Sequence, residues 1–239
     1  NLDYDFRLPS GSPMVQASIA GPVPNFTRPS SGSYFDENGT LVTAGNDIPR
    51  FHHDPVTGTA LGLLIEEQRE NVCLQTEDFS TTWVSVNSSE TTNAIVAPDG
   101  NTTADKLVED SSAGNQHYLV QSFLGLPDST RYAFSTHIQK AERTWIRSAI
   151  LRKDSVLKIA YFDVENGSIG TVSSGDSPII KDVGGGWFRC SHTADILFGG
   201  TTPSARLYLA EANNDVVFDG DGISGLYLWG AQLEVGAFP

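Results

Sequence analysis

Cysteine is almost absent from this chain of 239 residues, which contains only Cys73 and Cys190. Two cysteines allow one disulfide at most, so a small secreted fold held together by several disulfides is excluded. Cys190 follows Phe188 by two residues in a run that alternates apolar and polar side chains. This position predicts a buried free thiol that packs as a small hydrophobic side chain.

Basic charge is also scarce, with 15 Lys and Arg against 29 Asp and Glu and a net charge of −14 at pH 7. An acidic surface repels phosphate backbones, so we expect no nucleic-acid partner. Long hydrophobic runs are missing as well: no apolar stretch approaches the length that spans a bilayer. We therefore expect no membrane insertion.

Motifs of catalysis are the third absence. The sequence has no Gly-x-Ser-x-Gly elbow, no His-Glu-x-x-His, no P-loop and no Cys-x-x-Cys. These absences predict that the protein is not an enzyme. A glycan hydrolase or lyase stays a weaker alternative, because two carboxyl groups at a set separation need no sequence motif.

Seven short runs that alternate apolar and polar residues fill the last two-thirds of the chain, and Gly-, Pro- and Asp-rich turns separate them. Such runs in series are typical of half-buried antiparallel strands. We predict an all-β protein whose residues 71–239 form a jelly-roll β-sandwich. The runs are Tyr118–Phe123, Tyr132–Ile138, Trp145–Leu151, Leu157–Val164, Trp187–Ile196, Ala205–Ala210 and Leu226–Leu233.

Residues 1–70 differ from the rest because they hold seven of the 12 prolines. Proline at this density prevents long regular elements. Two short hairpins are predicted, one around the Asn38-Gly39 turn and one around residues 54–58. We expect this segment to be an extended arm that packs on the sandwich or on a neighbouring subunit.

Several longer motifs follow one another along the chain, among them Tyr34–Gly39, Asp54–Gly58, Gly62–Asn71, Ala97–Gly100, Gly186–Cys190 and Leu226–Glu234. In this order they resemble a module of bacteriophage head-fibre, tail-fibre and receptor-binding proteins. The part from Asn71 onward resembles jelly-roll carbohydrate-binding modules. The resemblance implies a domain on the virion surface that binds a polysaccharide or cell-surface glycan.

Phasing the strands gives a candidate sugar-binding platform. Aromatic side chains stack on sugars while polar side chains bind their hydroxyl or acidic groups. If the strands share one sheet, Trp145 and Tyr208 would stack on sugars and the other four residues would form hydrogen bonds. The residues predicted to face away from the core are His137, Gln139, Trp145, Arg147, Arg206 and Tyr208. The alternative is that Trp145 lies under the arm or in a contact between subunits.

Two further expectations concern the ends of the sandwich. Trp229 alternates with Ala231 and Leu233, which predicts a place in the core. The resemblance to jelly-roll sugar-binding modules implies a structural calcium ion near the first and last strands, since calcium takes oxygen ligands. The candidate ligands are Glu77, Asp78, Gln232 and Glu234.

The predicted function is non-catalytic glycan binding by a phage virion protein during attachment to a host surface. The alternative is a purely structural fibre or capsid decoration whose outward aromatic residues are buried between subunits. The sequence leaves the oligomeric state undecided between monomer and trimer. No heptad stretch predicts a coiled coil.

Overall fold

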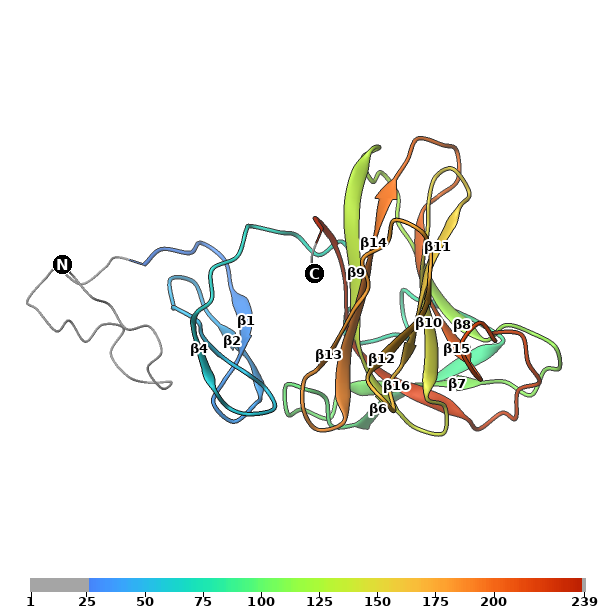
Figure 1. The fold of residues 1–239 in the computed structure, drawn as a ribbon, viewed down its shortest axis with the longest axis horizontal. Helices are drawn as coiled ribbons and strands as arrows, with labels where there is room; N and C mark the ends of the chain where they lie inside the picture. The colour runs from blue at the N-terminus through green and yellow to red at the C-terminus, as the bar shows by residue number, and fades with distance from the viewer. Residues whose placement is uncertain (1–25, 238–239) are drawn as a thin grey trace, which may run out of the picture. The chain divides into compact units, whose positions relative to one another are not determined.

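The computed structural model describes residues 26–237, which form two compact units (Figure 1). The first comprises the residues up to Gln68 together with Pro98–Gly100 and Val183–Gly185, and the second holds the remaining chain from Arg69. Within the described residues no helix has the length and hydropathy needed to cross a membrane. The expected arm over residues 1–70 begins outside the described part, and its packing stays a prediction.

Two small hairpins build the first unit, at the places the turn signals predict. β1 (Gly32–Phe35) pairs with β2 (Leu41–Ala44), and β3 (Phe51–His53) pairs with β4 (Ala60–Leu63). In the first turn, Asp36 Oδ1 accepts hydrogen bonds from the backbone N–H groups of Asn38 and Thr40, both at 2.9 Å. This local capping is why a polar turn closes so short a hairpin.

Two six-stranded antiparallel sheets form the second unit. Sheet I has the order β13-β14-β9-β16-β7-β6, and sheet II has the order β12-β11-β10-β15-β8-β5. Sheet I comprises β6 (Ser88–Ile95), β7 (Ala104–Glu109), β9 (Thr130–Lys140), β13 (Ile179–Asp182), β14 (Trp187–Ile196) and β16 (Gly225–Val235). Sheet II comprises β5 (Val84–Val86), β8 (Tyr118–Ser122), β10 (Trp145–Leu151), β11 (Leu157–Asp163), β12 (Ser168–Val172) and β15 (Ser204–Ala210).

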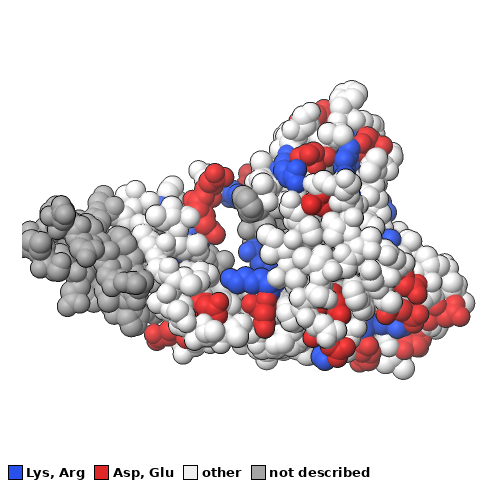
Figure 2. All heavy atoms as spheres, viewed as in Figure 1, with Lys and Arg blue, Asp and Glu red and all other residues white. Residues whose placement is uncertain are grey.

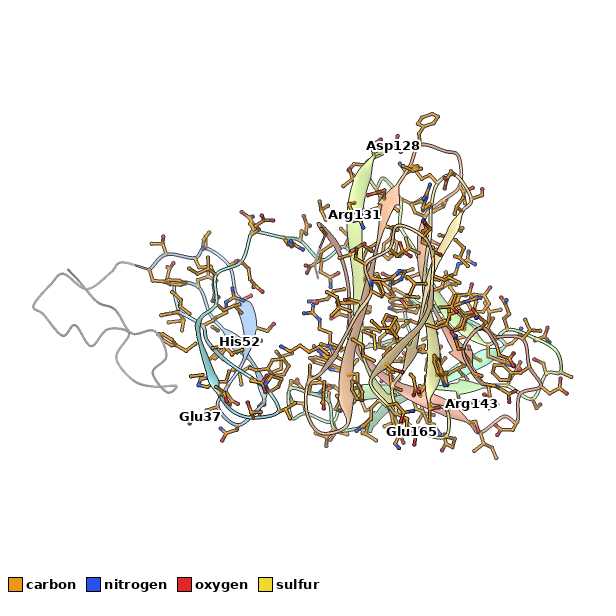
Figure 3. All side chains as sticks on the ribbon, in the orientation of Figure 1. Glu37, His52, Asp128, Arg131, Arg143 and Glu165 are labelled. Carbon is orange, nitrogen blue, oxygen red and sulfur yellow. The ribbon has the colours of Figure 1, made fainter. Side chains whose placement is uncertain are left out.

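The core lies between the two sheets and is made of alternate residues from their strands. Phe134 and Ile138 from sheet I and Ile146, Phe162 and Leu207 from sheet II are fully buried in it. All seven predicted runs are strands, so the all-β jelly-roll sandwich is confirmed. Figure 3 shows Asp128 and Arg131 at one end of the sandwich and Arg143 and Glu165 at the other.

The prediction that Trp229 lies in the core between the sheets is wrong, although the side chain is buried. Trp229 is buried, but it lies on the outward side of sheet I, where it is paired with His137. A β-bulge between Trp229 and Gln232, with Gly230 at a φ of 65°, shifts the alternation by one residue. Ala231 therefore faces the core while Trp229 does not, and the Trp229 indole donates a hydrogen bond to Thr103 Oγ1 at 3.0 Å.

Candidate functional site

Across the outward face of sheet II, four neighbouring strands each contribute one large side chain to a single row. Arg147 on β10 lies opposite Tyr161 on β11 and Tyr208 on β15, and Tyr208 lies opposite Tyr118 on β8. Directly paired residues of an antiparallel sheet share a face, so this register places Arg147 between Tyr161 and Tyr208 in the row. Together with Trp145 and Arg206, we call these residues the Tyr–Arg face.

Tyr208 is the centre of this face. The Arg147 guanidinium carbon lies 3.7 Å from the centre of its ring, and the Tyr118 ring stacks on it at 4.4 Å and 25°. Arg206 Nη1 donates a hydrogen bond to its hydroxyl at 3.2 Å. Tyr208 is 1% exposed, so it supports its neighbours, and a sugar would first meet the half-buried Tyr118.

Trp145 lies at the edge of the face, where it is half-buried over a glycine. A Cβ built on Gly170 of β12 would lie 2.7 Å from the Trp145 ring and 2.5 Å from Asn213 Oδ1. Asn213 itself accepts a hydrogen bond from the Thr171 N–H at 2.8 Å. A glycine in this strand is thus explained by the close approach of the indole and of the loop that follows β15.

The same loop supplies an apolar contact to the face. Val216 is buried in a small cluster with Ala149, Tyr161, Tyr208 and Ala210, outside the main core. Trp145 and Tyr118 pack against this cluster while staying partly exposed. The face therefore has a rigid apolar base with two accessible aromatic side chains at its surface, as ring stacking on a sugar requires.

His137 and Gln139 do not lie on this face. Both face outward as phased, but β9 belongs to sheet I, so the condition that all the strands share one sheet is not met. His137 is 5% exposed, and burial, with a smaller contribution from Arg189, lowers the pKa of its imidazole to about 3. The sugar-binding roles of the six predicted residues stay predictions, now divided between two sheets.

Two of the four predicted calcium ligands, Asp78 and Gln232, have hydrogen bonds to other groups. Asp78 Oδ1 accepts hydrogen bonds from the Ser80 N–H at 2.8 Å and its hydroxyl at 2.6 Å, which lowers the pKa of this carboxyl. Gln232 Oε1 accepts a hydrogen bond from Arg189 Nη2 at 2.7 Å, and a cation at this distance disfavours a metal ion. Across residues 26–237 no three His, Cys, Asp or Glu side chains, Glu77 and Glu234 included, are grouped as metal ligands.

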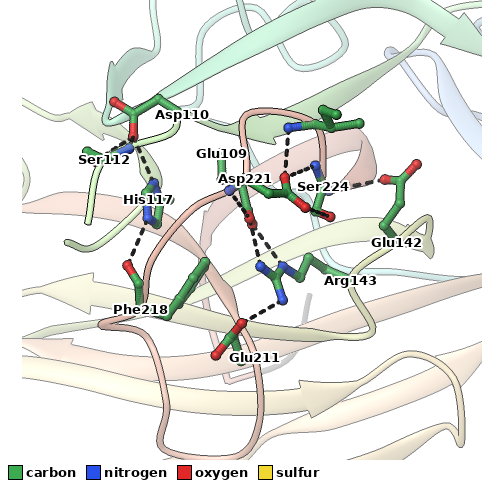
Figure 4. A network of polar contacts seen from close by, with 12 residues as sticks. Glu109, Asp110, Ser112, His117, Glu142, Arg143, Glu211, Phe218, Asp221 and Ser224 are labelled. Atoms are coloured by element: carbon green, nitrogen blue, oxygen red, sulfur yellow. Dashed lines mark hydrogen bonds and ion pairs between the residues drawn. The ribbon is translucent and has the colours of Figure 1, made fainter. Parts of the chain in front are cut away.

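An ionic network around the buried Glu109 holds the loops at one end of the sandwich (Figure 4). Arg143 donates to both carboxylate oxygens of Glu109, at 2.8 and 2.6 Å, and to Glu211 at 2.9 Å. Its guanidinium also lies 4.7 Å from the ring centre of Phe218. Figure 2 shows acidic side chains gathered at this end, where Figure 1 labels β7 and β15. We interpret this network as structural: its charged groups are paired with one another and hold the loops in place.

Sequence reasoning missed two members of the Tyr–Arg face, Tyr118 and Tyr161. Tyr118 begins a predicted strand and Tyr161 lies inside another, so the outward phase of each could have been read from alternation. Their place beside Tyr208 and Arg147 depends on strand pairing, which alternation does not reveal.

No protein-family model matches this sequence, and no curated protein matches it. Among solved structures it is similar to the tailspike protein 4 enzymatically active domain of bacteriophage CBA120, with a TM-score of 0.43 and 11% identity. This match covers 70% of the chain but only 21% of the tailspike chain.

Two further similar structures are isolated carbohydrate-binding modules. One is a xylan-binding domain of Paenibacillus barcinonensis, with a TM-score of 0.40, 11% identity and coverage of 70% of this chain and 92% of that one. The other recognises mannan, with a TM-score of 0.36, 11% identity and coverage of 71% and 96%. The ligands named here are those of the similar proteins.

Proposed function

We propose that the sandwich is a non-catalytic polysaccharide-binding domain and that the Tyr–Arg face is its binding surface. The observation that carries this proposal is the stack of Tyr118 on Tyr208, with Arg206 bonded to the Tyr208 hydroxyl. A half-exposed ring on a fixed base loses little conformational entropy when it stacks on a sugar. Trp145 offers a second ring on the same face.

The strands that form the Tyr–Arg face do not supply two carboxyl groups for catalysis. Asp163 is the one acidic residue in the six strands of sheet II. Its Oδ1 accepts the Glu165 N–H at 3.0 Å, and its Oδ2 accepts the Asn166 side chain at 2.7 Å. Glycoside hydrolysis by the usual route uses two carboxyl groups that flank the scissile bond, and these strands do not supply a second one.

The place of this binding is proposed to be the surface of a phage virion, during attachment to a host cell. The support is the ordered set of motifs that resemble those of phage fibre proteins, among them Gly62–Asn71 and Leu226–Glu234. The oligomeric state, monomer or trimer, stays a prediction that light scattering after gel filtration tests.

A glycan array probed with the wild-type domain and with Tyr118→Ala, Trp145→Ala and Tyr227→Ala tests the proposal. Tyr227 is the matched control, because it is a half-buried tyrosine on the outward side of sheet I. We expect binding that the first two substitutions weaken at least about tenfold and the control leaves unchanged. Absence of binding to every glycan by the folded domain would favour a purely structural virion role instead.

The predicted calcium ion has its own test in thermal unfolding with and without EDTA. A lower melting temperature in EDTA that added calcium restores would mark a bound structural ion. An unchanged melting temperature would reject it.

A further inference from the structure

The charge of sheet II is opposite to that of the whole chain. Its outward face has two basic residues in its strands, Arg147 and Arg206, and one acidic residue, Asp163, whereas Lys158 pairs with the core residue Ile150 and belongs to the other face. The chain as a whole has a net charge of −14. A local basic surface in an acidic protein points to an acidic ligand at that surface.

Arg147 has no carboxylate partner within residues 26–237. The residue is 8% exposed, and its Nε is buried without a hydrogen bond. Its guanidinium group lies over the Tyr208 ring, which is neutral. Asp163, the acidic residue of the same sheet, is engaged by the turn that follows β11. A buried guanidinium with unused donors costs free energy that an incoming acceptor would recover.

Arg206 is held beside Arg147 by neutral groups only. Its Nε donates to Ser204 Oγ at 3.1 Å and its Nη1 to Tyr208 Oη at 3.2 Å. Four other arginines of the described chain pair with carboxylates, as Arg50 does with Glu66 at 2.7 Å; the others are Arg131, Arg143 and Arg152. Two guanidinium groups around one tyrosine repel each other unless an anion lies between or above them.

We propose that the Tyr–Arg face selects carboxylated sugars, so that its ligand is a uronate-containing polysaccharide. This inference rests on the proposed glycan binding and names its substrate class. A guanidinium matches a carboxylate with two parallel hydrogen bonds. The carboxylate is bound by Arg206 and Arg147, while the sugar ring stacks on Tyr118.

The test compares alginate, polygalacturonate and hyaluronate with their methyl esters, with neutral xylan and mannan, and with dextran sulfate. Titration calorimetry is expected to show binding of at least one uronate polymer, at least tenfold tighter than its ester. Arg206→Gln is expected to weaken that binding about tenfold, which corresponds to about 1.4 kcal/mol. Lys181→Gln, an exposed cation on sheet I, is the charge-matched control and is expected to change nothing.

Arg206→Gln carries the test, because Arg206 is half-buried and its loss leaves the Arg147–Tyr208 contact in place. Arg147→Gln is measured beside it, with circular dichroism to confirm folding. Equal binding of acid and ester, or of neutral glycans alone, would overturn the carboxylate assignment while the proposed function stands. Equal binding of dextran sulfate would overturn it in favour of general anion capture. Binding to no glycan would overturn both proposals.

Discussion

His192 and Asp176 form a pair inside the protein: the imidazole Nδ1 lies 3.7 Å from a carboxylate oxygen, and the two side chains are 0% and 1% exposed. His192 faces the core from β14 and packs edge-on against Phe134. The pair is electrostatic, because neither carboxylate oxygen of Asp176 and neither ring nitrogen of His192 has a hydrogen-bond partner among the described residues. Each group is therefore the main polar neighbour of the other.

Removal of one member of this pair is expected to destabilise the fold. Asp176→Ala should lower the free energy of unfolding by about 3 kcal/mol, because a buried polar partner is left alone. The double variant Asp176→Ala/His192→Phe should regain part of that loss. Urea unfolding measures all three proteins, and an Asp176→Ala variant as stable as the wild type would contradict the prediction.

Glu109 should matter more to stability than Glu211, although both pair with Arg143. The Glu109 side chain is 0% exposed and that of Glu211 is 43% exposed. We expect Glu109→Gln to cost about 3 kcal/mol and Glu211→Gln less than about 1 kcal/mol. Thermal unfolding of the two variants shows which substitution costs more stability. Equal costs would contradict the prediction that the buried carboxylate matters more.

The buried imidazole of His137 predicts a pH dependence with a definite sign. Burial, then Arg189, lowers its pKa from 6.5 to about 3 in the folded protein. Between these values the unfolded chain binds a proton that the folded chain does not, so stability falls as the pH falls through this window. The slope is up to about 1.4 kcal/mol per pH unit.

His137→Leu should remove this contribution. The difference in unfolding free energy between variant and wild type should change steadily between about pH 6.5 and pH 3. Chemical unfolding across this pH range measures the difference. The contribution of the carboxylates cancels, because both proteins contain the same ones. Two parallel curves would show that His137 titrates normally.

Both thiols should be inert in the folded state. Burial raises the pKa of Cys73 to about 12 and raises that of Cys190 further, and both are free and buried. The reactive species is the thiolate, so a thiol reagent at pH 8 should modify neither within minutes and both after unfolding in guanidinium. Rapid reaction of the native protein would mean that one site opens. The predicted buried free thiol at Cys190 is confirmed.

Gly170→Ala should disturb the Tyr–Arg face from beneath Trp145. The new methyl group would meet the indole and Asn213 at 2.7 and 2.5 Å, so one of them must move. We expect a cost of about 1–3 kcal/mol, a shifted tryptophan emission and weaker glycan binding. Gly200→Ala, where nothing lies within 4 Å, is the control. Unchanged emission and binding would place Trp145 away from the ligand.

The sequence by itself determined the all-β class and the outward phase of the candidate residues. Alternation is a local property, because successive side chains of a strand point to opposite faces. It therefore placed Arg147 and Tyr208 outward before any pairing was known, and the structure agrees. Short turn signals such as Asn38-Gly39 likewise located the hairpins.

Only the tertiary structure decided which strands are neighbours. Pairing joins segments far apart in the chain, so the assignment of β9 to sheet I, which removes His137 from the face, is invisible to alternation. The same holds for Tyr118 beside Tyr208, and for the bulge at Gly230 that turns Trp229 away from the core. A binding face requires long-range register, whereas a strand requires only its own period.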